Sequence, residues 1–309
     1  MVGITLGDPG GVGPEVVLKA LEKVEGEFLL IGSKKVLEFY GKLLGCKKWK
    51  KHEVVDPFPQ INFSPGRPEG EASFVYFREG VRLVENNEVQ ALATAPVSKI
   101  AWFRAGFRFA GHTDYLEKRY GKKIYMGFYS EGMKVLLFTH HVPLKKALEQ
   151  VNRREFRIFL STAEKFLLNL FNEKELFIAS INPHGGEGGT LGREELEVIL
   201  PVLEEFRKED NFQFRGPFPT DTLFIEVEKK RKWMVAFFHD QGLAPFKLIH
   251  FDDGAEFNFG LDWIRTSACH GTGFEIAGKG VAREGSMLMA IKLATRLAKF
   301  RNDTSSVLP

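Results

Sequence analysis

Three segments of the chain place a histidine directly after an apolar run: Phe138–His141, Ser180–His184 and Phe237–Asp240. Short apolar runs are typical of buried strands, and open α/β sheets bind ligands outside the carboxyl ends of their strands. Imidazoles from three such strands can converge on one divalent metal ion and leave a coordination position open. Because His140 and His141 are adjacent, an extended backbone directs them to opposite sides, and only one is expected to be a ligand.

Residues around these histidines support a metal site. Taken singly, each histidine is more simply a hydrogen-bonded loop residue. The run His184–Gly189, however, has four glycines in six residues, so its backbone is free to approach a ligand closely. Asp240 follows His239 and is able to orient that imidazole through a hydrogen bond. The three contexts together favour a shared site.

A second cluster, Ala110–Asp114, places a histidine and a hydroxyl between glycine and an acidic residue. His112 and Thr113 are therefore candidates for binding substrate oxygens. Thr113 is equally a candidate N-cap for a helix expected over Tyr115–Tyr120. The two roles are compatible, and both stay open.

Two cationic residues, Lys247 and Arg265, flank the acidic stretch Asp252–Glu256. Such side chains are usually solvated at the surface. Arg265, however, lies between apolar and small polar residues, a setting that suits a buried bidentate contact with carboxylate or phosphate. Cys269 precedes His270, but sequence neighbours rarely have the geometry of a nucleophile and its base, so Cys269 is interpreted as a packing residue.

The glycine-rich run from Gly7 to Pro14 resembles a loop that holds phosphate at a helix N-terminus. Its glycines match neither GxGxxG nor GxxxxGK[ST]. Spacing alone therefore favours a tight turn with positive φ at several glycines. The sequence carries no Rossmann fingerprint, and the nicotinamide-binding residues stay unknown.

An alternation of strands and helices must position these residues. Apolar runs predict strands at 2–6, 27–32, 90–95, 134–139, 176–181, 233–238 and 247–251. Helical spacing predicts a helix from Pro14 and others over 35–44, 156–171, 194–206 and 287–300, followed by a polar tail over 301–309. Repeated strand–helix units imply an α/β fold with a mainly parallel sheet covered by helices on both faces.

The composition excludes several classes of protein. The 309 residues are 44% hydrophobic and 27% charged, which argues against disorder and coiled coil. A net charge of +3 is too small to imply nucleic-acid binding. No apolar run approaches the roughly 20 residues of a membrane-spanning helix. The N-terminal residues lack the basic region of a secretory signal peptide, so such a signal is not expected. With only two cysteines, a reduced cytoplasmic protein is expected.

Eight segments together resemble one family, the 4-hydroxythreonine-4-phosphate dehydrogenases of pyridoxal phosphate biosynthesis. They are collinear with that family and span nearly the whole chain. They read ITLGDPGGVGPE (4–15), TAPVSK (94–99), GHTDYLE (111–117), THHVPL (139–144), NPHGGEGGTLGREE (182–195), GPFPTDTLF (216–224), FHDQGLAPFK (238–247) and GLDWIRTSACHGT (260–272).

The resemblance implies two α/β/α domains with mainly parallel sheets and an active-site cleft between them. The first domain would combine 1–115 with 255–309, and the second, 116–254, would carry dimerisation and the metal ligands. The implied protein is a homodimer whose metal ligands come from both subunits. The implied reaction is NAD- or NADP-dependent oxidation of 4-phosphooxy-L-threonine with one divalent metal ion per subunit (zinc, magnesium or cobalt), followed by loss of CO2 to give 3-amino-2-oxopropyl phosphate.

The motifs also assign roles to residues. By resemblance the metal ligands are His141, His184 and His239, which selects His141 over His140. The substrate-binding positions are His112, Thr113, Lys247 and Arg265, and Lys247 is also able to assist proton transfer in catalysis.

Two positions depart from the family pattern. Glu256 stands where the family usually has an asparagine that contacts substrate. Asn258 shares a strand face with position 256 and is expected to replace that contact. A carboxylate at 256 is expected to repel phosphate or carboxylate unless it is protonated or turned away. Cys269 stands where the family often has aspartate.

Three alternatives remain open. A sister dehydrogenase would act on 4-phosphorylated threonate or erythronate. A metal-dependent decarboxylase or aldolase would work without a nicotinamide. A metabolite-binding protein without catalysis is disfavoured by three histidines in ligand-like contexts.

Overall fold

The computed structural model of the protein describes residues 1–207 and 211–305 and divides into two compact units. Unit 1 consists of Met1–Ile124 together with the chain from Phe251 onward, and unit 2 is Tyr125–His250. In both units helices connect strands that are mostly parallel. The predicted α/β fold is confirmed.

The boundaries between the units differ from the predicted ones because helices span or end near them. Helix α5 (His112–Tyr120) crosses position 115. Its Tyr115 ring packs on Phe74 and Phe77 with centroid distances of 5.6 and 5.4 Å, so the whole helix belongs to unit 1. The second boundary falls at the end of α10 (His239–His250) rather than after residue 254.

The strands of unit 1 lie in the order β3-β2-β1-β4-β11-β10. Their bounds are β1 Val2–Thr5, β2 Phe28–Ile31, β3 Glu53–Val55, β4 Ala91–Thr94, β10 Ala255–Phe259 and β11 Ile264–Ala268. Neighbouring strands are parallel except β10 and β11. A strand from the C-terminal part of the chain, β11, therefore pairs with β4 from the N-terminal part.

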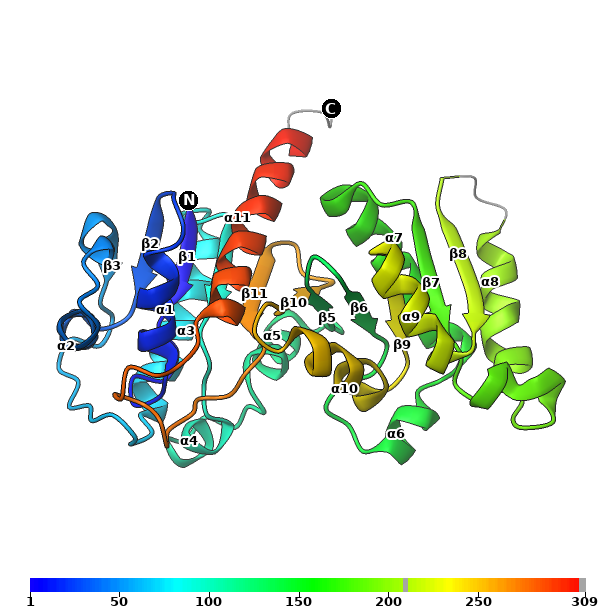
Figure 1. Ribbon diagram of the computed structural model, residues 1–309, viewed down its shortest axis with the longest axis horizontal. Coiled ribbons are helices and arrows are strands. Elements are labelled where there is room, and N and C mark those ends of the chain that lie inside the picture. The colour runs from blue at the N-terminus through cyan, green and yellow to red at the C-terminus, as the bar shows by residue number, and fades with distance from the viewer. Residues whose placement is uncertain (208–210, 306–309) are drawn as a thin grey trace. The chain divides into compact units, whose positions relative to one another are not determined.

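Helices cover both faces of this sheet. Their bounds are α1 Gly13–Leu21, α2 Lys34–Leu44, α3 Gly70–Glu85, α4 Lys99–Arg104, α5 His112–Tyr120 and α11 Gly285–Ser305, with a 3-10 turn at Lys48–Lys51. Helices α1 and α11 pack together, and α3 packs with α4 (Figure 1). On β11, Thr266 donates a hydrogen bond to the Ala290 carbonyl of α11. Because side chains alternate along a strand, Arg265 faces away from α11.

The strands of unit 2 lie in the order β5-β6-β9-β7-β8. Their bounds are β5 Tyr125–Tyr129, β6 Lys134–Leu137, β7 Glu175–Ala179, β8 Gln213–Phe218 and β9 Trp233–Ala236. Strand β5 is antiparallel to β6, and the other neighbouring pairs are parallel. The carboxyl ends of β6, β9 and β7 therefore adjoin at one edge.

The helices of unit 2 follow its strands and pack against the sheet. Their bounds are α6 Leu144–Glu149, α7 Arg153–Phe171, α8 Leu200–Phe206, α9 Thr220–Lys230 and α10 His239–His250, with a π-helical turn, Glu195–Ile199, before α8. Helix α10 lies close to the sheet at Gly242, where an added Cβ would come within 2.7 Å of Leu137 Cδ2 and 3.0 Å of Ala236 Cβ. This close packing fixes the start of α10 beside β6 and β9.

The structure corrects two predictions, the strand expected over 247–251 and the start of the polar tail expected over 301–309. The strand expected over 247–251 is the end of α10, whose buried Leu243, Phe246 and His250 recur at helical spacing. Leu248 and Ile249 suggested a strand, but they are exposed. The last helix continues to Ser305, so helix replaces the first part of the predicted tail, and 306–309 lie outside the described residues.

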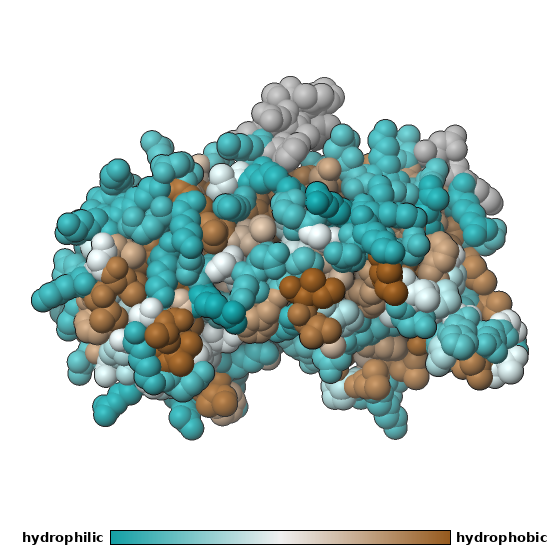
Figure 2. All heavy atoms as spheres, viewed as in Figure 1, coloured by the Kyte–Doolittle hydropathy of each residue, from teal (hydrophilic) through white to brown (hydrophobic). Residues whose placement is uncertain are grey.

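The surface carries isolated apolar side chains. In unit 2 these include Leu144, Leu248 and Ile249. The face seen in Figure 2 is predominantly hydrophilic, with small hydrophobic groups between the polar residues. Among the described residues, no helix has both the length and the apolar character needed to span a bilayer.

Candidate functional site

The three histidine-bearing segments follow adjacent parallel strands of unit 2. Because β6, β9 and β7 are neighbours, these segments leave the same edge of the sheet, as predicted. His141 and His239 come together there, with ring centroids 5.4 Å apart. The backbone at His141 has a φ of 45° and is not extended. The His140 ring lies 5.6 Å from that of His141 and nearly perpendicular to it.

His184 lies in the turn-rich segment Pro183–Gly189. Residues 184–188 all have positive φ. Gly185, Gly186 and Gly188 adopt this conformation without strain, whereas His184 and Glu187 do not, and such strain clusters at functional sites. Across 1–207 and 211–305, no group of three His, Cys, Asp or Glu residues is placed to hold a metal ion, so the chain by itself does not bring His184 into a triad.

The chemistry of these histidines nevertheless fits a divalent metal. The Nδ1 atom of His184 lies 2.8 Å from Glu187 Oε1, and that of His239 lies 2.7 Å from Asp240 Oδ1. A carboxylate bonded at Nδ1 leaves the Nε2 lone pair for a metal. The hydrogen bond to Glu187 also raises the pKa of His184. Since protons and metal compete for an imidazole, acid would weaken any metal binding by His184.

Two residues that the sequence did not single out brace the histidine segments. Gln241 Nε2 donates to the Ser180 carbonyl at 2.8 Å and to Thr220 Oγ1 at 3.1 Å, while its Oε1 accepts from Phe237 N at 2.6 Å. Gln241 therefore ties the segment after β9 to the segment after β7. The sequence feature that could have indicated this role is that Gln241 is a polar residue two positions after His239.

Glu195 is the second brace. It is buried, and its Oε1 accepts from the backbone N–H groups of Ile181 and Asn182, both at 2.7 Å. Its Oε2 accepts from Asn182 Nδ2 at 2.8 Å. These bonds fix the entry to the His184 turn. A glutamate inside the expected helix 194–206 gave no sign of this role.

Lys247 lies on α10 and is half-buried. Among the described residues its ammonium group has no hydrogen bond or ion pair, so it is available to a ligand anion. Within unit 2 it lies two turns along α10 from His239.

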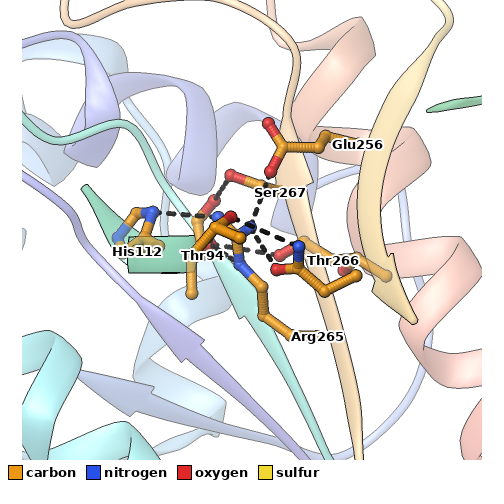
Figure 3. Close-up of polar contacts among 8 residues, drawn as sticks. Thr94, His112, Glu256, Arg265, Thr266 and Ser267 are labelled. Carbon is orange, nitrogen blue, oxygen red and sulfur yellow. Dashed lines mark hydrogen bonds and ion pairs between the residues drawn. The ribbon is translucent and has the colours of Figure 1, made fainter. Parts of the chain in front are cut away.

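In unit 1 a buried cluster surrounds Arg265, whose side chain is 1% exposed (Figure 3). Its Nε donates to Thr94 Oγ1 at 3.1 Å, and Nη2 donates to Thr94 Oγ1 at 2.9 Å and to His112 Nδ1 at 2.8 Å. Nη1 donates to Glu256 Oε1 at 2.6 Å and to Asn258 Oδ1 at 2.8 Å. All five N–H groups of the guanidinium are thus used inside the protein. We call these five residues the arginine cluster.

His112 is neutral within the arginine cluster. Burial, followed by the charges of Arg265 and Lys99, lowers the pKa of His112 well below 6.5. Because Nδ1 accepts from Arg265, the remaining proton lies on Nε2, a buried atom with no hydrogen-bond partner among the described residues. This orphaned N–H is a donor that a ligand oxygen can satisfy.

Thr113 lies next to the arginine cluster but is not a helix cap. The N-cap residue of α5 is Gly111, and Thr113 is inside the first turn. The hydroxyl of Thr113 accepts from Asn258 Nδ2 at 3.3 Å. The structure therefore brings together His112, Thr113, Asn258 and Arg265, four of the predicted substrate-binding residues. The structure adds Thr94 to this group. The sequence feature that could have indicated its role is its position at the end of a predicted strand.

The carboxylate of Glu256 was expected to repel a substrate phosphate or carboxylate unless it is protonated or turned away. Its carboxylate is 17% exposed and turned onto Arg265, and the two residues form an ion pair. Glu256 and Asn258 both contact Nη1 of Arg265, as two residues on one strand face can.

The glycine-rich run after β1 is a closely packed turn. Only Gly7 of its glycines has positive φ. A Cβ at Gly10 would lie 1.7 Å from the Arg67 carbonyl oxygen, so that glycine permits close backbone packing. The N–H groups of Gly10, Gly11 and Val12 already donate to acceptors within the protein. Cys269 is buried, as expected for a packing residue.

Comparisons with known proteins agree with this fold. The family described as pyridoxal phosphate biosynthetic protein PdxA matches residues 26–294. A 4-hydroxythreonine-4-phosphate dehydrogenase of Aquifex aeolicus is 37% identical over 94% of this chain and 96% of its own. A D-threonate 4-phosphate dehydrogenase of Pectobacterium atrosepticum is 33% identical over 96% of this chain and 99% of its own.

A crystal structure of 4-hydroxythreonine-4-phosphate dehydrogenase from Klebsiella pneumoniae superposes with a TM-score of 0.80. It is 31% identical and covers 96% of this chain and 99% of its own. Fold and relatives together define an oxidoreductase of the α/β class, a dehydrogenase. The chain belongs to the PdxA family, and the resemblance found in its motifs is confirmed.

Proposed function

We propose that the protein oxidises 4-phosphooxy-L-threonine with NAD or NADP and releases CO2 to form 3-amino-2-oxopropyl phosphate, a reaction of pyridoxine 5′-phosphate biosynthesis. The names of its relatives support this substrate. The observation that carries the proposal is the approach of His141 and His239 to 5.4 Å at the carboxyl edge of the sheet, where metal ligands are expected.

The metal ligands proposed are His141, His184 and His239. When bound, a divalent cation such as zinc, magnesium or cobalt supplies a Lewis acid at the reacting hydroxyl, and the nicotinamide accepts the hydride. Asp240 and Glu187 contact Nδ1 of their histidines, which would leave the Nε2 atoms to bind the cation.

Substrate binding is assigned to residues of both units. His112 donates its unsatisfied Nε2–H to a substrate oxygen, and Thr113 and Asn258 add polar contacts beside it. Arg265 holds these acceptors in place and contributes charge. Lys247, whose ammonium has no partner among the described residues, binds an anionic end of the substrate and delivers a proton after CO2 leaves.

The assembly proposed is a cytoplasmic homodimer with shared active sites. The resemblance supports metal ligands from both subunits and a dimer interface on the domain over 116–254. The small phosphorylated substrate is consistent with the family. Metal content and sedimentation of the purified protein, measured together, test whether the cation depends on the dimer.

The test of the activity is reduction of NAD or NADP by the purified protein with 4-phosphooxy-L-threonine, before and after chelation and metal readdition. His141→Ala and His239→Ala are expected to lower kcat/KM by more than about 100-fold and to lose bound metal. His52→Asn, a half-buried histidine of unit 1, is the matched control. The proposal fails if metal-loaded protein forms no reduced nicotinamide.

A second candidate activity is oxidation of a 4-phosphorylated threonate or erythronate. The D-threonate 4-phosphate dehydrogenase at 33% identity favours it specifically. Side-by-side kcat/KM values for the amino acid and the hydroxy acids separate the two. A decarboxylase or aldolase without redox chemistry would turn over when nicotinamide is omitted, and the dehydrogenase names of the relatives speak against it.

A further inference from the structure

The backbone pairing between β7 and β9 ends before the histidine edge is reached. The last residues that pair in this ladder are Ile178 and Val235. In the same register Ser180 would lie opposite Phe237. The N–H of Ser180, however, donates to the Phe218 carbonyl on the other side of β7. The ladder between β7 and β9 thus stops just before the segments that carry two of the three histidines.

The carboxamide of Gln241 takes the place of the next ladder bond. The Ala236 carbonyl accepts from the N–H of Phe138 on the β6 side, and a trans peptide directs its C=O and N–H to opposite sides, so the Phe237 N–H points toward β7. Gln241 Oε1 accepts from this N–H at 2.6 Å, and Nε2 donates to the Ser180 carbonyl at 2.8 Å. One side-chain amide therefore joins the two strands as an inserted peptide group would.

The bonding partners fix the orientation of this carboxamide. A backbone N–H needs an acceptor and a carbonyl needs a donor, so the oxygen faces β9 and the NH2 group faces β7. Thr220, the first residue of α9, accepts from Nε2 at 3.1 Å and donates to the same Ser180 carbonyl at 2.9 Å. A methionine at position 241 would have similar volume but would offer neither the donor nor the acceptor.

The other side of β9 is joined to its neighbour directly. Thr139, which follows β6 and is buried, donates to the Phe237 carbonyl from its backbone N–H at 3.2 Å and from its hydroxyl at 2.6 Å. The segments after β6 and β9 stay together beyond this point, as the 5.4 Å between the His141 and His239 rings shows. The segment after β7 is instead joined to β9 through the inserted carboxamide, whose length sets the spacing of these two segments.

We propose that Gln241 is a positioning residue of the metal site, whose carboxamide holds the ends of β7 and β9 at the separation at which His184 and His239 bind divalent cations. The inference rests on the proposed function, which assigns these histidines to metal. It applies whether the two histidines bind one cation or two cations of a dimer. Gln241 acts through Ser180 and Phe237, the residues at which the two histidine segments begin.

The test measures cation affinity and coordination together. In Gln241→Met the Kd for Zn²⁺, from calorimetric titration, is expected to rise by about 10–100-fold, and the visible absorption spectrum of the Co²⁺-loaded protein is expected to change. A role confined to stability would lower the urea midpoint and move neither readout. Gln213→Met, at an exposed glutamine of β8 in the same unit, is the matched control and is expected to leave both unchanged.

Failure of the inference differs from failure of the proposed function. An unchanged Kd and Co²⁺ spectrum in Gln241→Met overturn the inference, even if the urea midpoint falls. Unaltered protein that binds Zn²⁺ but forms no reduced nicotinamide overturns the proposed activity, and the variant still decides the role of Gln241. Unaltered protein that binds no divalent cation overturns the metal ligands and this inference together.

A second variant covers the case in which Gln241→Met does not fold, as judged by circular dichroism. Thr220→Val removes one acceptor of Gln241 Nε2 and one donor to the Ser180 carbonyl. The Kd for Zn²⁺ is then expected to rise by about fivefold, the equivalent of one hydrogen bond. A Kd equal to that of the unaltered protein would overturn the inference.

Discussion

Thr94 Oγ1 accepts two of the five N–H groups of Arg265, at 3.1 and 2.9 Å, and is itself fully buried. Thr94→Val preserves the shape of the side chain and removes this acceptor. Buried guanidinium N–H groups then lack a partner, so the free energy of unfolding is expected to fall by about 1–3 kcal/mol. Urea denaturation followed by circular dichroism measures the change.

The matched control is Thr295→Val on α11. Its hydroxyl donates only to the Ile291 carbonyl one turn earlier, so the expected loss is within about 0.5 kcal/mol. Equal losses in the two variants would show that Thr94 does not support Arg265.

Asp8 predicts a pH dependence of stability. Burial raises its pKa from 3.8 to about 6. Below pH 3.8 the group is protonated in both states and carries no penalty. As pH rises from 3.8 to 6, the unfolded chain ionises first, and the folded protein loses up to about 3 kcal/mol relative to it.

Asp8→Asn retains an oxygen for the Gly10 and Glu69 N–H groups and removes the ionisation. The variant is expected to recover part of that stability above pH 6 and none of it below pH 3.8. Urea midpoints at both pH values measure the difference. Asp262→Asn, at a largely exposed side chain, is the control and should show no such crossover.

At the scale of elements, the segment after β7 depends on Glu195 at the start of the next helical turn. Glu195→Gln puts an amide against the Asn182 amide and weakens the bonds to Ile181 and Asn182. The free energy of unfolding is expected to fall by about 1–3 kcal/mol, and affinity for Zn²⁺ by about 10–100-fold. Calorimetric titration with Zn²⁺ measures the latter.

Glu197→Gln provides the comparison for this prediction. Glu197 lies on the same turn and forms an exposed ion pair with Arg193, which is worth at most about 1 kcal/mol. If both variants lose the same amount of Zn²⁺ affinity, the bonds of Glu195 to Ile181 and Asn182 do not position the His184 segment for metal binding.

The sequence predicts some elements well and others poorly for physical reasons. The apolar strands β6, β7 and β9 are mostly buried, so their runs locate the histidine edge directly. Strand β10 contains Glu256 and Asn258, which both accept hydrogen bonds from Arg265 on the neighbouring strand. A contact between separate strands leaves no periodic pattern. Four members of the arginine cluster were therefore singled out one by one from the sequence, whereas Thr94 and the hydrogen bonds among the five residues were not.

Local patterns also mislead where tertiary packing decides. The apolar residues after Lys247 suggested a strand, but burial of Phe246 and His250 selects the helix α10. Thr113 has the right chemistry for a cap, yet Gly111 takes that position and Thr113 accepts from Asn258 instead. The pairing of His141 with His239 follows from strand order, which the chain order alone does not reveal.

At the scale of the whole molecule, unit 1 is discontinuous in sequence. Strand β11 lies between β4 and β10, and α11 packs on β4 and β11. A chain ending at His250 lacks all of these C-terminal elements and exposes the apolar face of β4. Such a fragment is expected to show no cooperative unfolding of unit 1, measured by hydrogen exchange, whereas residues 125–250 retain protected amides.

The opposite outcome would be informative in itself. Protection of β1, β2 and β4 in the shortened chain equal to that in the full chain would mean that β11 and α11 are dispensable for the N-terminal part. A chain shortened only after Ser305 is the control, since it keeps every described element.

The placement of β11 has a consequence for synthesis on the ribosome. Roughly 170 residues separate Thr94 from Ile264, which at translation rates of about 5–20 residues per second is a wait of roughly 10–30 s. Throughout that interval the nascent protein presents β4 as an edge without its β11 partner, and 125–250 are completed before β11 is made. In protease treatment of stalled nascent chains, residues 125–250 are expected to become resistant before residues 1–124 do. Until the C-terminal strand is made, the exposed edge of the N-terminal part needs protection from pairing with other chains.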